Sequence, residues 1–177
     1  MDSRGYLSGT ELNNYLLDMH IAQAYASLNR IMIITKIAKS VGFKIDEEFE
    51  SIHNYVDITR NIIRKGAIST IKDKKVIIPL NMRDGSIIAR GKGNEDWNKS
   101  GPHGAGRILS RSKAKQEIDL ELYKLSMEGI YSTCINKSTI DESPFAYKDK
   151  DMIIDAIGDS VEIINIIKPI LNIKAGE

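Results

Sequence analysis

A short run of small residues around one histidine is the segment of this chain best suited to chemistry. It reads Gly101-Pro102-His103-Gly104-Ala105-Gly106-Arg107, and Ser110-Arg111 follows closely. Glycine has no Cβ and tolerates positive φ, so backbone N–H groups in such a run can approach a ligand closely. Arg107 and Arg111 are permanently charged donors suited to phosphate oxygens. The pattern predicts a histidine beside a phosphate, as a ligand or as a nucleophile on phosphorus. A glycine-rich turn that happens to contain a histidine is the alternative.

Further unusual blocks lie on both sides of this run, in a fixed order. They are His53-Asn54-Tyr55-Val56, Arg64-Lys65-Gly66-Ala67, Ile78-Pro79-Leu80-Asn81-Met82-Arg83-Asp84-Gly85-Ser86, Asp141-Glu142-Ser143-Pro144-Phe145-Ala146-Tyr147-Lys148 and Lys168-Pro169 followed by Lys174. In this order the blocks resemble the RtcB family of RNA-splicing ligases, in the form typical of bacteria. The likeness runs from about Tyr6 to Lys174, which is nearly the whole chain.

The resemblance implies a GTP- and Mn²⁺-dependent RNA ligase. Such an enzyme joins an RNA 2′,3′-cyclic phosphate or 3′-phosphate end to a 5′-hydroxyl end through a guanylated histidine. The expected partners are therefore GTP and RNA, either tRNA halves or other broken ends. A neutral histidine is nucleophilic near pH 7, which suits the first step of that chemistry.

The resemblance also implies a role for individual residues. His103 is the expected catalytic nucleophile, and His53 is an expected manganese ligand, since imidazole suits a transition metal. The nucleotide is expected to contact residues from several of the blocks, which are Asn54, Pro79, Leu80, Asn81, Met82, Ser86, His103, Gly104, Ala105, Gly106, Tyr147 and Lys174.

The length of 177 residues is less than half of what the family implies. Family members take most of their metal ligands, an aspartate, a cysteine and two histidines, from an N-terminal part that has no counterpart before His53. We therefore expect this chain to be the C-terminal portion of such a ligase, whether a truncated reading frame, half of a split gene or an expressed fragment. The missing ligase part, or a second copy of the chain, is then an expected partner.

The predicted fold class is α+β, with a long N-terminal scaffold helix packed on a β-rich body. Ser8-Gly9-Thr10-Glu11 has the pattern of a capping box, and Gly42 is a natural stop, which predicts a helix over 8–42. Apolar residues all round at 31–34 predict burial on several sides. The nucleotide-binding body is expected over 46–177, so that residues 1–177 form one domain. Within it we expect short strands between 60 and 88, a helix over 110–127, a short helix over 152–157 and a β-rich tail over 161–173.

Two charged pairs allow two interpretations each. Arg64-Lys65 is either a charged strand edge, which discourages pairing with other molecules, or part of the surface that RNA or nucleotide approaches. Asp141-Glu142 could be taken for a catalytic carboxylate pair. Because adjacent residues seldom face the same point, we interpret these two as ordinary loop charges.

The composition is that of an ordinary globular protein. The net charge is +1, so no global field marks a nucleic-acid binder, and RNA contact would need a local patch. A single cysteine, Cys134, excludes an internal disulfide framework and predicts a cytoplasmic location. No apolar run approaches the ~20 residues that cross a bilayer, so no membrane is expected as a partner.

Other functions remain open at this point. The chain could be a non-catalytic fragment that binds guanine nucleotide or RNA without chemistry of its own. It could also be an inert fragment whose fold depends on pairing with another copy, because large apolar patches seek partners.

Overall fold

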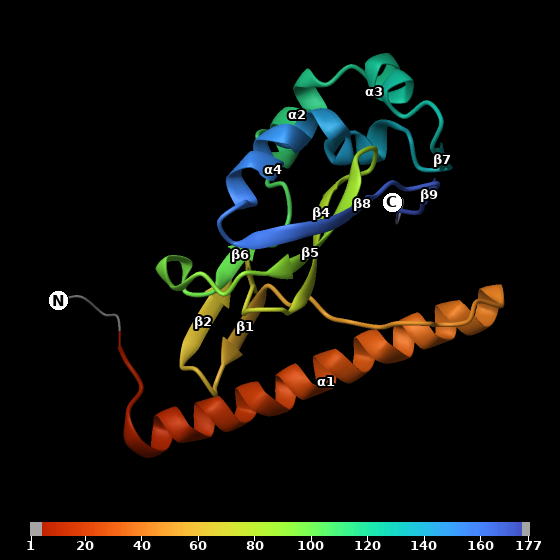
Figure 1. Cartoon of the computed structure of the whole chain (residues 1–177). Coiled ribbons are helices and arrows are strands. Elements are labelled where there is room, and N and C mark those ends of the chain that lie inside the picture. Colours follow the sequence, from red (N-terminus) through yellow and green to blue (C-terminus); the bar gives the residue numbers. More distant parts are fainter. Residues whose placement is uncertain (1–4, 175–177) are drawn as a thin grey trace. The chain divides into compact units, whose positions relative to one another are not determined.

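The computed structural model describes residues 5–174 (Figure 1). Its described residues form two compact units, the first from 5–48 and 54–65 and the second from 49–53 and 66–174. Both helices and strands are present, which confirms the α+β class. One domain over the whole chain, and a long helix packed on the β-rich body, stay predictions.

The first unit is dominated by helix α1, Gly9–Val41. Ser8 is the N-cap residue as expected, but its side chain makes no capping hydrogen bond, so the predicted capping box is wrong. Gly42 ends the helix in the left-handed conformation at φ 74°, with its N–H bonded to the carbonyl of Ala38, which confirms the predicted stop.

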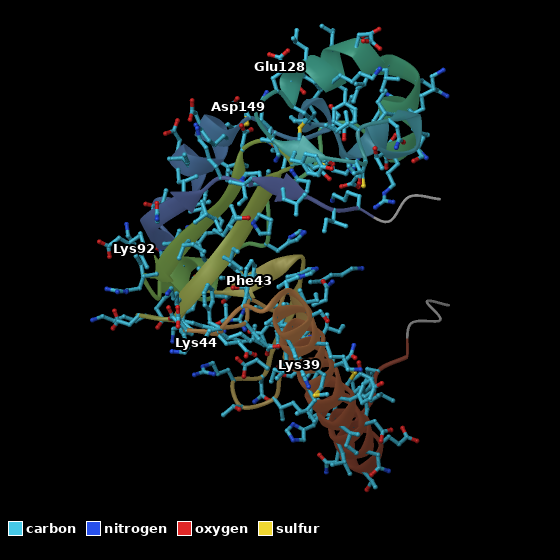
Figure 2. All side chains as sticks on the ribbon, turned by 90° about the vertical axis from the view of Figure 1, so that its right-hand side faces the viewer. Lys39, Phe43, Lys44, Lys92, Glu128 and Asp149 are labelled. Atoms are coloured by element: carbon cyan, nitrogen blue, oxygen red, sulfur yellow. The ribbon has the colours of Figure 1, made fainter. Side chains whose placement is uncertain are left out.

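The apolar residues of α1 are not buried in the protein. None of the helix residues is buried, and Ile33 and Ile34 are each 48% exposed, so the burial predicted for 31–34 is wrong. Figure 2 shows side chains around the whole helix, with Lys39 in its last turn. Apolar spacing and good helix formers are enough to specify the helix, but they do not say what covers it.

A hairpin completes the first unit. Strands β1, Asn54–Asp57, and β2, Ile62–Lys65, pair antiparallel, and the β1 segment was not expected as a strand. The Gln23 side chain of α1 joins them to the helix, because it accepts from the N–H of Val56 at 2.7 Å and donates to its carbonyl at 3.2 Å. The hairpin is thus attached to α1 through the backbone N–H and carbonyl of Val56.

Arg64 is the buried charge of this hairpin. It is 3% exposed, and its Nη1 donates to the Tyr55 hydroxyl at 3.1 Å and to Asp57 Oδ2 at 3.5 Å. Its guanidinium carbon lies 5.6 Å from the centre of the Tyr55 ring. A buried guanidinium with these partners stabilises the hairpin. The interpretation of Arg64 as an exposed charge at a strand edge is therefore excluded.

The second unit is built on a three-stranded antiparallel sheet in the order β4-β5-β8. The strands are β4, Lys75–Asn81, β5, Gly85–Gly91, and β8, Val161–Ile167. Gly85 follows the β4–β5 turn at φ +82°, and a Cβ there would lie 1.9 Å from the carbonyl oxygen of Ile167. Only glycine lets the turn bring β4 and β5 together this close to β8.

Two short pairings flank this sheet. β3, Ala67–Ser69, pairs antiparallel with β6, Ser100–Pro102, and β7, Tyr131–Ser132, pairs parallel with β9, Leu171–Asn172. The strands predicted between 60 and 88 and the β-rich tail are therefore present.

The helices of the second unit are short. The α-helices are α2, Arg111–Glu117, α3, Leu120–Ser126, and α4, Lys150–Ile157; the 3₁₀-helices are η1, Glu95–Trp97, η2, Lys137–Glu142, and η3, Pro144–Ala146. The single helix predicted over 110–127 is wrong, because Ile118 is extended and the Asp119 side chain caps a new helix by accepting from the N–H of Leu122. The short helix predicted over 152–157 is confirmed as part of α4.

The second unit has two hydrophobic cores. The larger joins the sheet to α4 and contains Ile68, Val76, Ile78, Leu80, Ile87, Ala89, Ala105, Ile153, Ile157 and Val161. The smaller contains Met82, Tyr123, Met127 and Ile140. Leu80 and Met82, in adjacent cores, thus fix the end of β4 between them. Within residues 5–174, no helix combines the length and the apolar character that crossing a bilayer requires.

Candidate nucleotide site

The histidine loop lies directly against the end of β4. It follows β6, and the N–H of Ala105 donates to the carbonyl of Pro79 at 3.0 Å. A Cβ on Gly104 would lie 3.0 Å from that same oxygen, and Gly106 has φ +72°. The small residues of the loop therefore allow two backbone segments to approach closely. The approach of the loop's backbone N–H groups to a ligand stays a prediction, and the N–H of Ala105 is used within the protein.

Two histidines from different blocks meet at this loop. The rings of His53 and His103 stack with their centres 4.6 Å apart and an interplanar angle of 12°. His103 Nδ1 lies 2.6 Å from the carbonyl oxygen of Gly66. A carbonyl only accepts hydrogen bonds, so Nδ1 must carry the proton, and the lone pair of a neutral His103 is then on Nε2. The chain thus fixes both the tautomer and the orientation of this ring.

A cavity of about 810 Å³ opens beside the two histidines, within the second unit. This volume is in the range of small-molecule and cofactor sites. Its lining comes from five stretches of chain and consists of Ser51, His53, Ile77, Pro79, Leu80, Asn81, Met82, Gly85, Ser86, His103, Gly104, Ala105, Gly106, Arg107, Arg111, Glu142, Tyr147, Pro169, Asn172 and Lys174.

The structure brings all but one of the expected site residues to this cavity. His53, His103 and the rest of the expected nucleotide-binding set line it, apart from Asn54. Asn54 begins β1 and belongs to the first unit. That these residues bind a nucleotide, and that His103 reacts, stay predictions.

Several of the lining residues also have a structural role. Leu80, Met82 and Ala105 are 3–4% exposed and belong to the hydrophobic cores. The Asn81 side chain closes the β4–β5 turn, because its Oδ1 accepts from the N–H groups of Arg83 and Asp84. These side chains are committed to the fold, so they shape the cavity more than they select its ligand.

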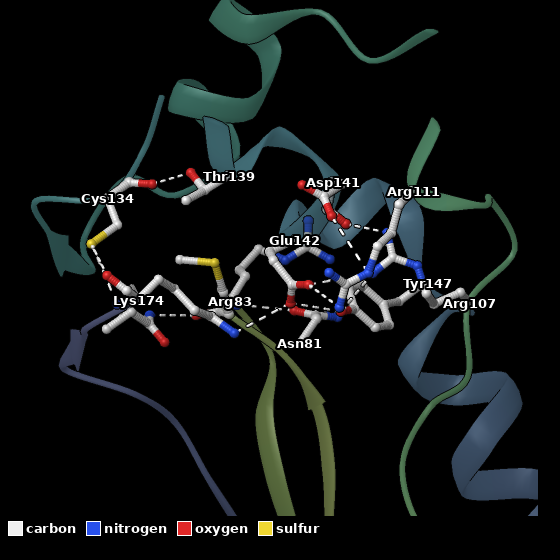
Figure 3. Close-up of polar contacts among 12 residues, drawn as sticks. Asn81, Arg83, Arg107, Arg111, Cys134, Thr139, Asp141, Glu142, Tyr147 and Lys174 are labelled. Carbon is white, nitrogen blue, oxygen red and sulfur yellow. Dashed lines mark hydrogen bonds and ion pairs between the residues drawn. The ribbon is translucent and has the colours of Figure 1, made fainter. Parts of the chain in front are cut away.

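Part of the cavity lining is a cluster of charged groups around Glu142 (Figure 3). The Glu142 carboxylate accepts hydrogen bonds from the Tyr147 hydroxyl at 2.9 Å and from Lys174 Nζ at 3.2 Å. Arg107 Nη1 lies 3.5 Å from this carboxylate, and Arg111 Nη2 lies 3.7 Å from it. One carboxylate is therefore shared by three cations and a phenol.

Arg107 is held on all sides of its guanidinium. Nε donates to the carbonyl of Leu109 at 3.1 Å, Nη2 to the carbonyl of Asp141, and Nη1 to the Tyr147 hydroxyl at 3.2 Å. The guanidinium carbon also lies 5.0 Å from the centre of the Tyr147 ring. Such a fixed cation is suited to binding an anion, since little side-chain freedom remains to be lost.

The environment shifts the acidity of this cluster in two directions. Burial raises the pKa of Glu142, but the hydrogen bond from Tyr147 and the charges of Lys174 and Arg107 outweigh it, and the net pKa is lowered. Burial, with a smaller contribution from the bond to Glu142, raises the pKa of Tyr147 to about 12. At neutral pH the carboxylate is therefore charged and the phenol is a hydrogen-bond donor.

The backbone of Lys174 is held by the only cysteine. The Lys174 N–H donates to Cys134 Sγ at 3.3 Å, and Sγ lies 3.2 Å from the Lys174 carbonyl oxygen. The N–H of Lys174 and the hydroxyl of Thr133 lower the pKa of the Cys134 thiol. Cys134 and β7 thus bring this part of the chain back to the cavity.

Sequence reasoning missed three charged residues of the site. Arg107 and Arg111 were interpreted as hydrogen-bond donors suited to phosphate oxygens, but they were not included among the expected nucleotide contacts. The interpretation of Asp141-Glu142 as ordinary loop charges is wrong, since Asp141 is 5% exposed and Glu142 lines the cavity. A signal was available, because two arginines and a carboxylate within conspicuous blocks suggest an ion-pair cluster.

The residues present do not form a manganese site by themselves. Among residues 5–174, no three His, Cys, Asp or Glu side chains gather as metal ligands would. His53 is exposed beside His103 and can supply a single ligand. One imidazole does not hold Mn²⁺ tightly, so His53 would need further ligands from outside the described residues.

Comparison with known proteins places this sequence in one class of proteins, the tRNA-splicing and RNA-splicing ligases. Residues 6–175 match the family model described as tRNA-splicing ligase RtcB. The chain belongs to the RtcB family, as its motifs predicted.

Individual relatives agree with the family model. The RNA-splicing ligase RtcB of Escherichia coli K12 is 34% identical over 187 residues, which cover 96% of this chain and 46% of that protein. The tRNA-splicing ligase RtcB of Aeropyrum pernix is 32% identical over 81% of this chain and 37% of its own length. That of Nanoarchaeum equitans is 29% identical over 81% of this chain and 38% of its own length. The chain thus spans less than half the length of these relatives.

Proposed function

We propose that this chain carries the guanylate-accepting part of a GTP- and Mn²⁺-dependent RNA ligase. The observation that supports this most is the placement of His103. Its Nδ1 is bonded to the carbonyl of Gly66, its ring borders the cavity, and Arg107 and Lys174 line the same cavity. A directed Nε2 lone pair beside fixed cations is what attack on a phosphate requires.

The proposed first step forms a covalent intermediate on the histidine. His103 Nε2 attacks the α-phosphorus of GTP, an N–P bond forms, the bond to the bridging oxygen breaks, and pyrophosphate leaves with its electrons. Nδ1–H stays bonded to Gly66, which stabilises the positive charge on the ring during the attack. Arg107, Arg111 and Lys174 are placed to neutralise phosphoryl oxygens.

The later steps transfer GMP to RNA and release it. Water opens the 2′,3′-cyclic phosphate to a 3′-phosphate, whose oxygen attacks the guanylated histidine and takes the GMP, so that the N–P bond breaks. The 5′-hydroxyl of the second RNA then attacks the activated 3′-phosphorus, and GMP leaves. Each step is a displacement at phosphorus, for which orientation and charge neutralisation are the main contributions of the protein.

Mn²⁺ belongs to this proposal through the family resemblance. His53 would be the one ligand that the described residues contribute, and the metal would neutralise phosphoryl charge. The substrates, RNA ends such as tRNA halves, are likewise proposed from the family. The cytoplasmic location expected from the sequence stays a prediction.

A second candidate is a module that binds guanine nucleotide or RNA without chemistry of its own. The observation in its favour is that the described residues gather no group of three metal ligands. The cavity and the cations around Glu142 would suffice for binding. In either case the partner that completes the enzyme would be the missing ligase part, or a second copy of the chain.

The test is intact-mass measurement of the purified chain after incubation with GTP and Mn²⁺. A GMP adduct on the wild type and none on His103→Ala supports the ligase proposal. If no adduct forms but calorimetry shows that the chain binds GMP, the binding module is favoured. An adduct of normal yield on His103→Ala excludes His103 as the nucleophile.

A further inference from the structure

Glu142 has an unusual set of partners for a residue that was interpreted from the sequence as an ordinary loop charge. Its two carboxylate oxygens divide the cluster between them. Oε2 takes the Tyr147 hydroxyl and Lys174 Nζ, and Oε1 lies within 4 Å of both Arg107 and Arg111. These four partners all line the cavity. A carboxylate offers about four acceptor directions, and this one accepts three hydrogen bonds and has Arg111 as a further ion-pair partner.

The partners come from segments that are far apart in the sequence. Arg107 and Arg111 flank Ser110, Tyr147 follows η3, and Lys174 follows β9 (Figure 3). Glu142 itself is the last residue of η2, which begins with a capping box at Asn136. One side chain on a capped helical turn therefore joins three separate pieces of the cavity wall.

The charges of this wall would not hold together without a central anion. Three cations converge there, and without the carboxylate their repulsion would drive the long side chain of Lys174 towards solvent, where that of Arg111 already largely lies. Asp141 compensates only in part, because its carboxylate lies 3.8 Å from Arg111 Nε, while its carbonyl serves Arg107. Fixing such side chains before a ligand arrives lowers the entropy lost on binding.

From these contacts we infer that Glu142 is a positioning residue for the nucleotide. It holds Tyr147, Lys174 and Arg107 on the cavity wall in the arrangement that a guanine nucleotide meets, without contacting the reacting atoms. The inference rests on the proposed function, since it names how the same cavity is kept ready for its ligand.

Binding of GMP by isothermal titration calorimetry tests the inference on the full chain. Glu142→Gln keeps the size of the side chain and one acceptor oxygen but removes the negative charge. We expect this variant to bind GMP about tenfold more weakly, because its charge-assisted hydrogen bonds are lost. Glu128→Gln is the matched control, because Glu128 is exposed just after α3 and does not line the cavity (Figure 2).

A second readout follows the arrangement itself. Tyrosine labelled with ¹³C at Cζ reports the ionisation of Tyr147 by NMR, where burial and the bond to Glu142 raise the pKa to about 12. Arg107 and Arg111 oppose that rise. We expect the pKa of Tyr147 to fall in Glu142→Gln, because the hydrogen bond to Glu142 contributes to the rise, and to stay unchanged in Glu128→Gln.

The outcomes separate the two proposals. If the wild type binds GMP and Glu142→Gln binds it equally well or more tightly, Glu142 does not position the site, and the proposed function stands. If the wild type itself does not bind GMP, the proposed nucleotide site fails, and the role of Glu142 fails with it. Should Glu142→Gln not fold, Tyr147→Phe removes only the hydroxyl that Glu142 holds, and undiminished GMP binding by this variant overturns the inference.

Discussion

Each unit of this protein contains an arginine that is stacked on a tyrosine and paired with a carboxylate. In the first unit these are Arg64, Tyr55 and Asp57, and in the second they are Arg107, Tyr147 and Glu142. The Arg64 and Asp57 side chains are 1% and 10% exposed, whereas those of Arg107 and Glu142 are 25% and 22% exposed. The same three groups make a cluster with a buried ion pair in the first unit, called the closed cluster below. In the second unit they make a cluster with a partly exposed ion pair, called the open cluster below.

The difference shows what separates a structural ion pair from a binding surface. The closed cluster has its guanidinium buried in the hairpin. The open cluster lines a cavity and gathers two further cations, Arg111 and Lys174, around one carboxylate. An excess of positive charge at a cavity favours an anionic ligand there over a neutral one.

The largest effect expected is on stability, from breaking the closed cluster. Arg64→Met removes the buried partner of Asp57 and leaves it the ion pair with the more exposed Arg60. We therefore expect the free energy of unfolding to fall by about 3 kcal/mol, the low end for a buried pair that loses one member. Urea denaturation followed by circular dichroism measures this. A loss below about 1 kcal/mol, the usual value of an exposed pair, would make the closed cluster no different from a surface one.

Arg107→Met tests the open cluster, because its main effect should be on the binding of GMP. We expect GMP affinity to fall by about 10-fold to 100-fold, corresponding to roughly 1.4–2.7 kcal/mol. The reason is the loss of a fixed cation from the cavity wall. Calorimetry with GMP gives the affinity, and Arg60→Met, at a partly exposed arginine of the first unit, is the control. Equal affinities of Arg107→Met and the wild type would remove this cluster from the proposed site.

The two tyrosine hydroxyls should differ in how much each contributes to stability, the one in the closed cluster contributing more. Tyr55→Phe removes an acceptor from a buried guanidinium, so we expect it to cost about 1–2 kcal/mol of stability. Tyr147→Phe should cost less than about 1 kcal/mol, because water can replace the hydroxyl in an open cavity. Parallel urea titrations compare them, and the reverse ranking would contradict the assignment of closed and open clusters.

The smallest effect expected is a dependence of stability on pH. The pKa of Glu142 is lower in the folded protein than its ordinary value of 4.5, so its stabilising contribution is complete above that value. It is lost as the pH falls below 4.5 through the folded pKa, because the unfolded chain then binds the proton more readily. We expect the unfolding free energy of Glu142→Gln to fall less steeply than that of the wild type over this acid range. Identical slopes would mean that the open cluster contributes nothing to stability.

Local patterns predicted the elements better than their caps. Gly42 and the β-branched runs at 76–78 and 87–88 gave the end of α1 and the two strands of the sheet. The Ser8 capping box did not form, and the helix expected over 110–127 ends where Asp119 starts a new one. Both errors concern single side-chain hydrogen bonds, which compete with helical periodicity and are not visible in it.

The site was predictable as far as contiguous motifs reach. The blocks around His53, Pro79, His103 and Tyr147 meet at one cavity, as the family resemblance implied. The role of Glu142 depends on residues 107, 111, 147 and 174, and no local pattern reports a contact between positions so far apart. Ion-pair clusters of this kind have to be read from the folded chain.

The dispersed origin of the cavity has a consequence for how the second unit folds. The β4 and β5 strands need only a tight turn at Arg83-Asp84 to meet, so their hairpin is a local event. The cavity needs residues 53, 103, 142 and 174 together, and each of these encounters closes a long loop, which is slow because its entropic cost comes before any contact forms. We therefore expect the sheet to be an early kinetic product and the ligand cavity one of the last features to assemble. A pulse-labelling hydrogen-exchange experiment would then protect β4 and β5 well before the backbone amide of Lys174.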